Sequence, residues 1–186
     1  IRKMIGVHHE MMQRLFEVSK KKIMDAEKAG KTGPTSMLAE MLRMRMSGDA
    51  DAKTLTDSEI LDEITTVRGA GHETTSNTLC WAMLLLAQNP DKLAKLRAEA
   101  DVVVKGDIAT YDEAKAAHYC HSVVLEALRL YPTVPSFPRE CHKDVVLPGD
   151  GKYDVPAGSY VFVSQRALNR MGWDEPDAFK PERFDS

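Results

Sequence analysis

The sequence predicts a mainly α-helical chain with a small β part. From the N-terminus to about residue 130, apolar side chains recur at helical spacing, and glycine, asparagine or proline ends several of these segments. After Pro132 the pattern changes to short β-branched and aromatic runs, separated by turns that contain proline and glycine. Helices followed by a small sheet are typical of a mainly α or an α+β chain.

The first predicted helix covers residues 1–29, where apolar positions share one face. A segment rich in glycine and proline ends it. Ser36 can cap a second helix that reaches about Met46, and a polar loop over residues 47–53 follows. The first of these two helices is therefore expected to bury one side only.

A long third helix is predicted to end near Gln88, where Asn89 and Pro90 follow. Thr56, with Glu59 three residues later, forms the capping-box pattern at its start. Further helices are expected over residues 91–104, 111–117 and 119–130. Strands are expected over residues 145–147 and 160–163, with turns at residues 148–151 and 156–158.

We expect one domain over residues 1–186. Its expected parts are helices over residues 1–132, a small β region over residues 133–165, and a short helix and meander over residues 166–186.

Composition excludes several classes of protein. The 186 residues are 43% hydrophobic and 28% charged, which is typical of a folded globular chain. A formal net charge of -3 argues against a nucleic-acid-binding surface. Cys80, Cys120 and Cys141 lie far apart, so neither a disulfide framework nor a zinc site is indicated. The longest apolar run, residues 79–87, is too short to cross a bilayer, and the helical opening indicates a segment of a larger protein.

The long third helix carries a polar interruption at residues 70–77. Gly71 costs about 1 kcal/mol relative to alanine there, and threonine hydroxyls compete for carbonyls one turn back, so a kink or widening is expected. Apolar residues on both sides predict a buried helix, in which polar side chains need partners. Such departures from local rules concentrate at functional sites, although a surface patch of small polar residues gives the same pattern.

Glu126 and Arg129 are the only charges between Val123 and Leu130, and their spacing puts them on one side of a helix. Because apolar residues flank them, we expect the pair to be enclosed, which requires pairing and hydrogen bonds. One guanidinium can satisfy more than one partner. We therefore expect a second arginine or a further acceptor from elsewhere in the chain.

Three motifs in order resemble the cytochrome P-450 family of haem-thiolate monooxygenases: Ala-Gly-x-Glu-Thr-Thr at 70–75, Glu-x-x-Arg at 126–129 and Pro-Glu-Arg-Phe at 181–184. Glu-x-x-Arg alone carries little weight, whereas the ordered set is specific. The resemblance extends over essentially the whole chain and covers less than half of a typical member. It implies a partial cytochrome P-450 fold, with a long helix on the distal side of the haem, the Glu-x-x-Arg helix, a small sheet and a meander.

The resemblance assigns the handling of protons during dioxygen cleavage to Glu73 and Thr74. It implies that Thr74 is the local proton donor and that Glu73 is the link to solvent. The residues that it places against the haem are Ala70, Gly71, Thr74 and Arg139. Arg139 would bind a propionate, although an exposed arginine at a strand end is an equal alternative. The residues that it places around the substrate are Thr66, Gly69, Ala70, Val134, Ser136 and Phe137.

Glu126, Arg129 and Arg183 match the family's Glu-Arg-Arg triad, which the resemblance implies stabilises the core behind the haem. The family's iron ligand is a cysteine in a glycine-containing loop after Pro-Glu-Arg-Phe. None of the three cysteines lies in such a pattern. We therefore expect no metal ligand among these residues, a cysteine ligand after Ser186, and no activity from this segment alone.

For the whole protein, the resemblance implies insertion of one oxygen atom from O2 into a lipophilic, fatty-acid-like substrate. The implied cofactor is haem b, with electrons from NADPH through a reductase. An N-terminal anchor in the endoplasmic reticulum membrane, with the enzyme on the cytoplasmic face, is also expected. Two alternatives stay open: a haem-free homologue acting as a helical interaction module, and a structural protein with chance motifs, in which Glu126 and Arg183 would lie far apart.

Overall fold

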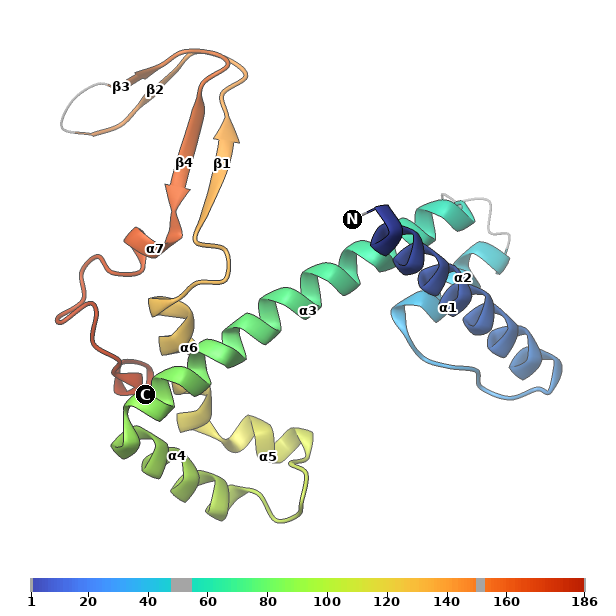
Figure 1. The fold of residues 1–186 in the computed structure, drawn as a ribbon, viewed down its shortest axis with the longest axis horizontal. Helices are drawn as coiled ribbons and strands as arrows, with labels where there is room; N and C mark the ends of the chain where they lie inside the picture. The colour runs from blue at the N-terminus through green and yellow to red at the C-terminus, as the bar shows by residue number, and fades with distance from the viewer. Residues whose placement is uncertain (1, 48–54, 150–152, 186) are drawn as a thin grey trace. The chain divides into compact units, whose positions relative to one another are not determined.

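The computed structural model describes residues 2–47, 55–149 and 153–185. Among these residues, six helices come before the strands, as can be followed in Figure 1: α1 (Arg2–Lys28), α2 (Met37–Ser47), α3 (Asp57–Gln88), α4 (Pro90–Val103), α5 (Tyr111–Ala116) and α6 (His118–Leu130). The remaining elements are β1 (Ser136–Glu140), β2 (Val145–Leu147), β3 (Tyr153–Val155), β4 (Tyr160–Ser164), α7 (Gln165–Leu168) and the 3₁₀-helix η1 (Pro181–Phe184). The predicted mainly α chain with a small β part is confirmed.

The chain forms two compact units, residues 1–73 and residues 74–186, and α3 contributes to both. Within the described residues, no helix is long and apolar enough to cross a membrane. Most of the loop predicted at residues 47–53 and the second half of the turn predicted at residues 148–151 lie outside the described residues.

In the first unit, α1, α2 and the start of α3 share an apolar core. Its buried members are Phe16, Ile23, Leu38, Ala39, Leu42 and Ile60. The expected capping box is present, because Glu59 accepts from the backbone N–H of Thr56 at 2.7 Å and returns its own N–H to the Thr56 hydroxyl at 3.2 Å. Asp57 accepts from Lys20 at 3.4 Å and from Arg45 at 2.5 Å, so one carboxylate links all three helices.

The middle of α3 is an uninterrupted α-helix, so the predicted widening is wrong, and most of residues 70–77 are exposed in this chain, with Thr74 and Ser76 half-buried. The apolar residues that flank it pack in different cores: Ile60 in the first unit, and Leu85 and Leu86 in the second. The segment between them belongs to neither core. Just after it, the side chain of Thr78 donates to the carbonyl of Thr74 at 2.9 Å, and the helix continues without a break.

The second unit is built on one face of α6. Its buried side chains on that face, Tyr119, Val123, Ala127 and Leu130, pack with Ala82, Leu85 and Leu86 of α3 and with Phe179. α4 begins at Pro90, because the proline that ends α3 is well suited to the first position of the next helix. Figure 1 shows α4, α5 and α6 following one another at this end of α3.

The N-terminus of α6 is capped by a side chain of α4. The flanking residue Ala117 has no side chain that can cap the helix. Instead, the two carboxylate oxygens of Glu99 accept from the backbone N–H groups of Tyr119 at 2.7 Å and Cys120 at 2.9 Å. Two of the N–H groups that every helix start leaves unpaired are thereby satisfied.

The strands form two antiparallel pairs, β1 with β4 and β2 with β3. Phe137 lies opposite Val163 in the first pair, and Val146 lies opposite Asp154 in the second. Pro138 fits in β1 because a two-stranded pair leaves each strand an edge that needs no N–H donor. Cys141 donates its N–H to the carbonyl of Ser159 at 2.9 Å, just beyond β1 and β4.

Candidate functional site

Glu126 is the centre of a buried charge cluster. α6 carries Glu126 and Arg129 one turn apart, and their side chains are 0% and 4% exposed. Arg129 donates through Nε to one carboxylate oxygen at 2.6 Å and through Nη2 to the other at 2.8 Å. This bidentate geometry is the strong form of a carboxylate–guanidinium pair, and the enclosure predicted from the sequence is present.

Arg129 also holds the chain that follows α7. Its guanidinium donates to the carbonyls of Asn169 at 3.3 Å, Pro176 at 2.7 Å and Ala178 at 3.2 Å. These are the further acceptors that the sequence led us to expect. They fix residues 169–178, which have no regular ladder of their own after α7, against α6.

Arg183 reaches the same carboxylate from η1. Its Nε lies 3.4 Å from Oε1 of Glu126, and its Nη2 donates to the carbonyls of Asp174 at 2.6 Å and Glu175 at 2.8 Å. Glu126 and Arg183 are 57 residues apart in the sequence, yet they form an ion pair. The hypothesis of chance motifs required them to lie far apart and is therefore wrong.

A cleft of about 350 Å³ is lined by residues of α3 and α6 and by Thr133. Its lining residues are Thr74, Thr75, Thr78, Leu79, Val124, Leu128 and Thr133. Of these, the sequence analysis named only Thr74. Thr78 could have been found by helical spacing, because it lies one turn after Thr74 on the same helix face.

A second cleft of about 360 Å³ shares Leu128 and Thr133 with the first. Its other lining residues are Pro132, Val134, Phe137, Gln165 and Asn169. Val134 and Phe137 of the predicted substrate residues thus lie at one cleft, whereas Ser136 is exposed at the start of β1. The predicted residues Thr66, Gly69 and Ala70 lie on the exposed part of α3 that belongs to the first compact unit.

The two predicted catalytic residues are consecutive on α3: Glu73 is exposed and Thr74 is half-buried. A Cβ added at Gly71, one turn before, would meet none of the described atoms within 4 Å. Arg139 is exposed on β1, where it donates to the carbonyl of Pro138 at 3.0 Å and lies 4.9 Å from the centre of the Phe137 ring.

The family of the chain follows from its match to a protein-family model. The family model described as Cytochrome P450 matches residues 1–186. The chain belongs to the cytochrome P450 family. The expected resemblance is thereby confirmed, and the helices and small sheet described above are part of a cytochrome P450 fold.

Curated cytochromes P450 are similar to most of the chain. Cytochrome P450 97B2, chloroplastic, of Glycine max is 43% identical over 156 residues, which is 80% of this chain and 26% of the relative. Cytochrome P450 97B1, chloroplastic, of Pisum sativum is 41% identical and covers 80% of this chain and 28% of the relative. Cytochrome P450 3A6 of Oryctolagus cuniculus is 40% identical over 77% of this chain and 29% of the relative. The chain thus spans about a quarter to a third of the length of these relatives.

The expected location in the endoplasmic reticulum is wrong. Two of these cytochromes P450 carry the word chloroplastic in their names, which conflicts with it. Targeting signals are segments at the N-terminus that are separate from the folded core. The expectation was carried over from the family resemblance, which rests on residues within the fold and carries no information about the compartment.

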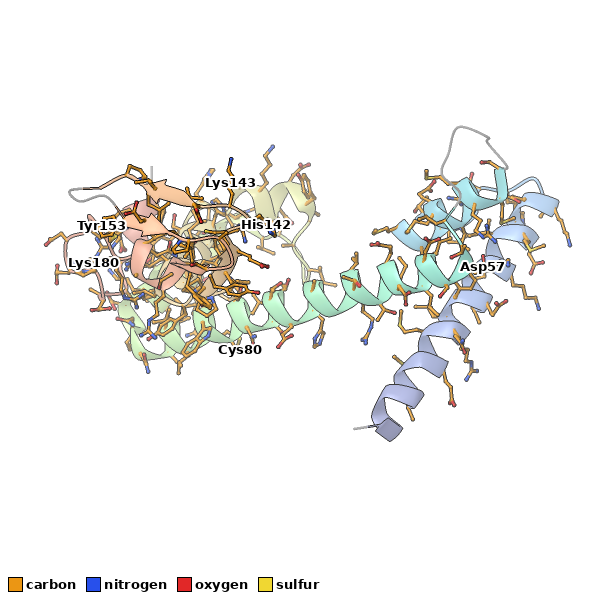
Figure 2. The ribbon with its side chains drawn as sticks, turned by 90° about the horizontal axis from the view of Figure 1, so that it is seen from above. Asp57, Cys80, His142, Lys143, Tyr153 and Lys180 are labelled. Carbon is orange, nitrogen blue, oxygen red and sulfur yellow. The ribbon has the colours of Figure 1, made fainter. Side chains whose placement is uncertain are left out.

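The cysteines of this cytochrome P450 chain lie in regular elements or beside them. Cys80 is exposed on α3, from which it projects in Figure 2, and Cys141 is half-buried directly after β1. Partial burial, with Glu99 nearby, raises the pKa of the Cys120 thiol, which disfavours the thiolate form that ligates metals. Over residues 2–47, 55–149 and 153–185, no group of three or more His, Cys, Asp or Glu side chains could hold a metal ion.

Proposed function

We propose that the whole protein is a haem-dependent monooxygenase, an oxidoreductase that inserts one oxygen atom from O2 into a lipophilic substrate. Membership of the cytochrome P450 family supports the reaction class. The observation that carries the proposal is the cleft in which Thr74 of α3 faces Val124 and Leu128 of α6.

The residues at this cleft fit a haem. Leu79, Val124 and Leu128 offer an apolar wall to a flat apolar ring system, and threonine hydroxyls supply a few polar groups. When bound through a cysteine of the whole protein, the haem supplies the redox chemistry of dioxygen cleavage. We propose that Ala70 and Gly71 border this space; a Cβ added at Gly71 would meet no described atom within 4 Å.

Glu73 and Thr74 are proposed to move protons. Thr74 lines the cleft, and we propose that its hydroxyl holds a proton close to the reacting oxygen. The Glu73 carboxylate is its neighbour in sequence and is exposed, so it can exchange protons with solvent. Together, the exposed carboxylate and the half-buried hydroxyl would form a short path for protons from water to the site.

Other residues are proposed to bind and position. Val134 and Phe137 would contact the substrate from the second cleft, which is lined largely by apolar side chains. Thr66, Gly69, Ala70 and Ser136 are proposed to complete the substrate surface in the whole protein. Arg139 is exposed, and its guanidinium group carries several hydrogen-bond donors. We propose that it binds a haem propionate.

The Glu126–Arg129–Arg183 cluster is proposed to support the site without taking part in the chemistry. Its hydrogen bonds fix residues 169–178 and η1 against α6, whose residues Val124 and Leu128 line the cleft. We propose that the chain is one partial monooxygenase domain of the whole protein. The proposed partners are an NADPH-dependent reductase and a fatty-acid-like substrate, with a membrane attachment from outside these residues. The names of two relatives favour a plastid location.

The first test is spectroscopic. The whole protein is expressed, reduced and exposed to carbon monoxide. A Soret band at the red-shifted position of thiolate-ligated haem is the expected result. A protein that folds but binds no haem would overturn the proposal and favour the haem-free helical module.

The second test changes Thr74→Ala in the whole protein. Oxygen consumption is expected to continue while product per NADPH falls and hydrogen peroxide rises, because proton delivery is lost while reduction is not. Thr65→Ala, the same change on α3 in the other compact unit, serves as the control and should leave the ratio unchanged. Equal ratios in both variants would remove Thr74 from the proton path.

A further inference from the structure

The buried charge cluster carries an excess of positive charge. The side chains of Glu126, Arg129 and Arg183 are 0%, 4% and 9% exposed. They hold one carboxylate and two guanidinium groups, and arginine stays charged at any ordinary pH. Two like charges on one carboxylate are costly in a poorly solvated place unless further groups compensate them.

Hydrogen bonds compensate Arg129 but leave part of Arg183 unsatisfied. Oε1 of Glu126 already accepts from Nη2 of Arg129 at 2.8 Å and from the backbone N–H of Lys180 at 2.8 Å. Nε of Arg183 lies 3.4 Å from that oxygen and is buried without a hydrogen-bond acceptor among the described residues. An unsatisfied donor on a buried cation calls for another source of negative potential.

The Trp173 ring, in a residue that is 36% exposed, lies close to both guanidinium groups. The guanidinium carbon of Arg183 lies over this ring, 5.3 Å from its centroid, and that of Arg129 lies 5.8 Å from the same centroid. The face of an indole is the most negative of the aromatic side chains, and distances below about 6 Å give a significant cation–π attraction. Phe184 lies against Trp173 with ring centroids 5.7 Å apart, so the ring is held from η1 as well.

We propose that Trp173 is the fourth member of the cluster, a positioning residue whose π face offsets the excess charge of Arg129 and Arg183. The same ring attracts both guanidinium groups, so it reduces the cost of bringing the two cations together on Glu126. This role goes beyond the proposed function, because it concerns the electrostatics of the fold and does not depend on the reaction.

The test replaces Trp173 in the whole protein with tryptophans that carry one, two and three ring fluorines, introduced at that site alone. Each fluorine withdraws electron density from the ring face while keeping its size nearly constant. The denaturant midpoint is expected to fall with each added fluorine. Between the native protein and the trifluoro variant, the unfolding equilibrium constant should rise roughly tenfold. Circular dichroism follows the unfolding and needs neither haem nor activity.

The matched control is the same series at Trp81. This ring stacks on Tyr131 with centroids 4.0 Å apart and an interplanar angle of 5°. This contact between two aromatic rings involves no cation, so no stepwise fall of the denaturant midpoint is expected for the Trp81 series. Equal trends at the two positions, or no trend at Trp173, would overturn the proposal.

Natural substitutions separate electrostatics from packing. Trp173→Phe keeps a π face and should retain part of the stability, whereas Trp173→Leu keeps only apolar volume and should retain less. Equal losses in the two variants would assign Trp173 to apolar packing alone. A protein that proves haem-free would overturn the proposed function but leave these midpoints interpretable.

Discussion

Two charge clusters each include a residue of η1 and are centred on a glutamate, and the two glutamates differ in burial. Arg183 joins the buried cluster around Glu126, and the residue before it, Glu182, joins an outer cluster with Lys92 at 3.2 Å, Lys95 at 3.6 Å and the Tyr119 hydroxyl at 3.1 Å. The Glu126 side chain is 0% exposed and that of Glu182 is 39% exposed. Water can replace a lost partner only in the outer cluster, so the buried one specifies geometry and the outer one adds a small increment.

The largest expected effect comes from Glu126→Gln in the whole protein. The variant leaves two buried guanidinium groups without a counter-ion, so the free energy of unfolding should fall by about 3–5 kcal/mol in a denaturant titration. Glu182→Gln is the matched change in the outer cluster and should cost about 1 kcal/mol or less. Similar losses in both variants would show that burial does not distinguish the clusters.

Arg183→Lys keeps the charge but removes the fork that reaches the carbonyls of Asp174 and Glu175. One ammonium cannot donate to both carbonyls and keep its charge beside Glu126 in the same geometry, so a loss of about 1–3 kcal/mol is expected. Arg170→Lys is the control, since Arg170 pairs with the exposed Asp177. In thermal unfolding, the Tm of Arg183→Lys should lie well below that of Arg170→Lys. The reverse order would contradict the importance of the fork.

Tyr119→Phe removes the hydroxyl that donates to Glu182 and leaves the buried ring in place. The expected loss in a denaturant titration is about 0.5–1.5 kcal/mol. In the double variant with Glu182→Gln, the two losses should not add, because both remove the same contact. Full additivity would mean that the hydrogen bond contributes nothing.

The outer cluster should also give a pH dependence. Burial opposes the charge of Glu182, but hydrogen bonds from its own backbone N–H, Lys92 and Tyr119 outweigh it and lower the pKa of this carboxyl. A folded-state pKa below the unfolded value of about 4.3 gives stability that is present above that pH and is lost as the pH falls below it. The difference in unfolding free energy between the native protein and Glu182→Gln should therefore shrink between about pH 5 and pH 3. A constant difference would contradict the lowered pKa.

The smallest effect is expected for Lys95→Met. Lys95 pairs with Asp185 at 3.0 Å and lies 4.0 Å from the centre of the Tyr119 ring, but its side chain is 46% exposed. The loss should stay below about 1 kcal/mol and disappear in high salt, where exposed charges are screened. A loss that persists in 1 M salt would indicate that the cation–π contact outweighs the ion pairs.

The features that the sequence predicted correctly depend on interactions between residues close together in the chain. Thr56 with Glu59 and Asn89 with Pro90 mark helix ends through hydrogen bonds and sterics of adjacent residues, so these boundaries were right. The burial of Glu126 with Arg129 followed from the apolar residues around them.

The contacts made by segments without regular secondary structure could not be predicted from the sequence pattern. Residues 169–178 have little periodicity, so neither the carbonyls that bind Arg129 nor the ring of Trp173 stood out. The exposure of the middle of α3 depends on which core each end joins, and periodicity within the helix does not contain that information.

The cap that Glu99 provides for α6 has a consequence for the order of folding. The start of α6 is satisfied by a residue about 20 positions earlier in the chain, so α6 cannot reach full stability before α4 has formed. Contacts of such short sequence separation form early, because closing a short loop costs little chain entropy. We therefore expect α4 to α6 to condense first, as a unit onto which η1 docks late, so that contacts of η1 act mainly on the rate of unfolding.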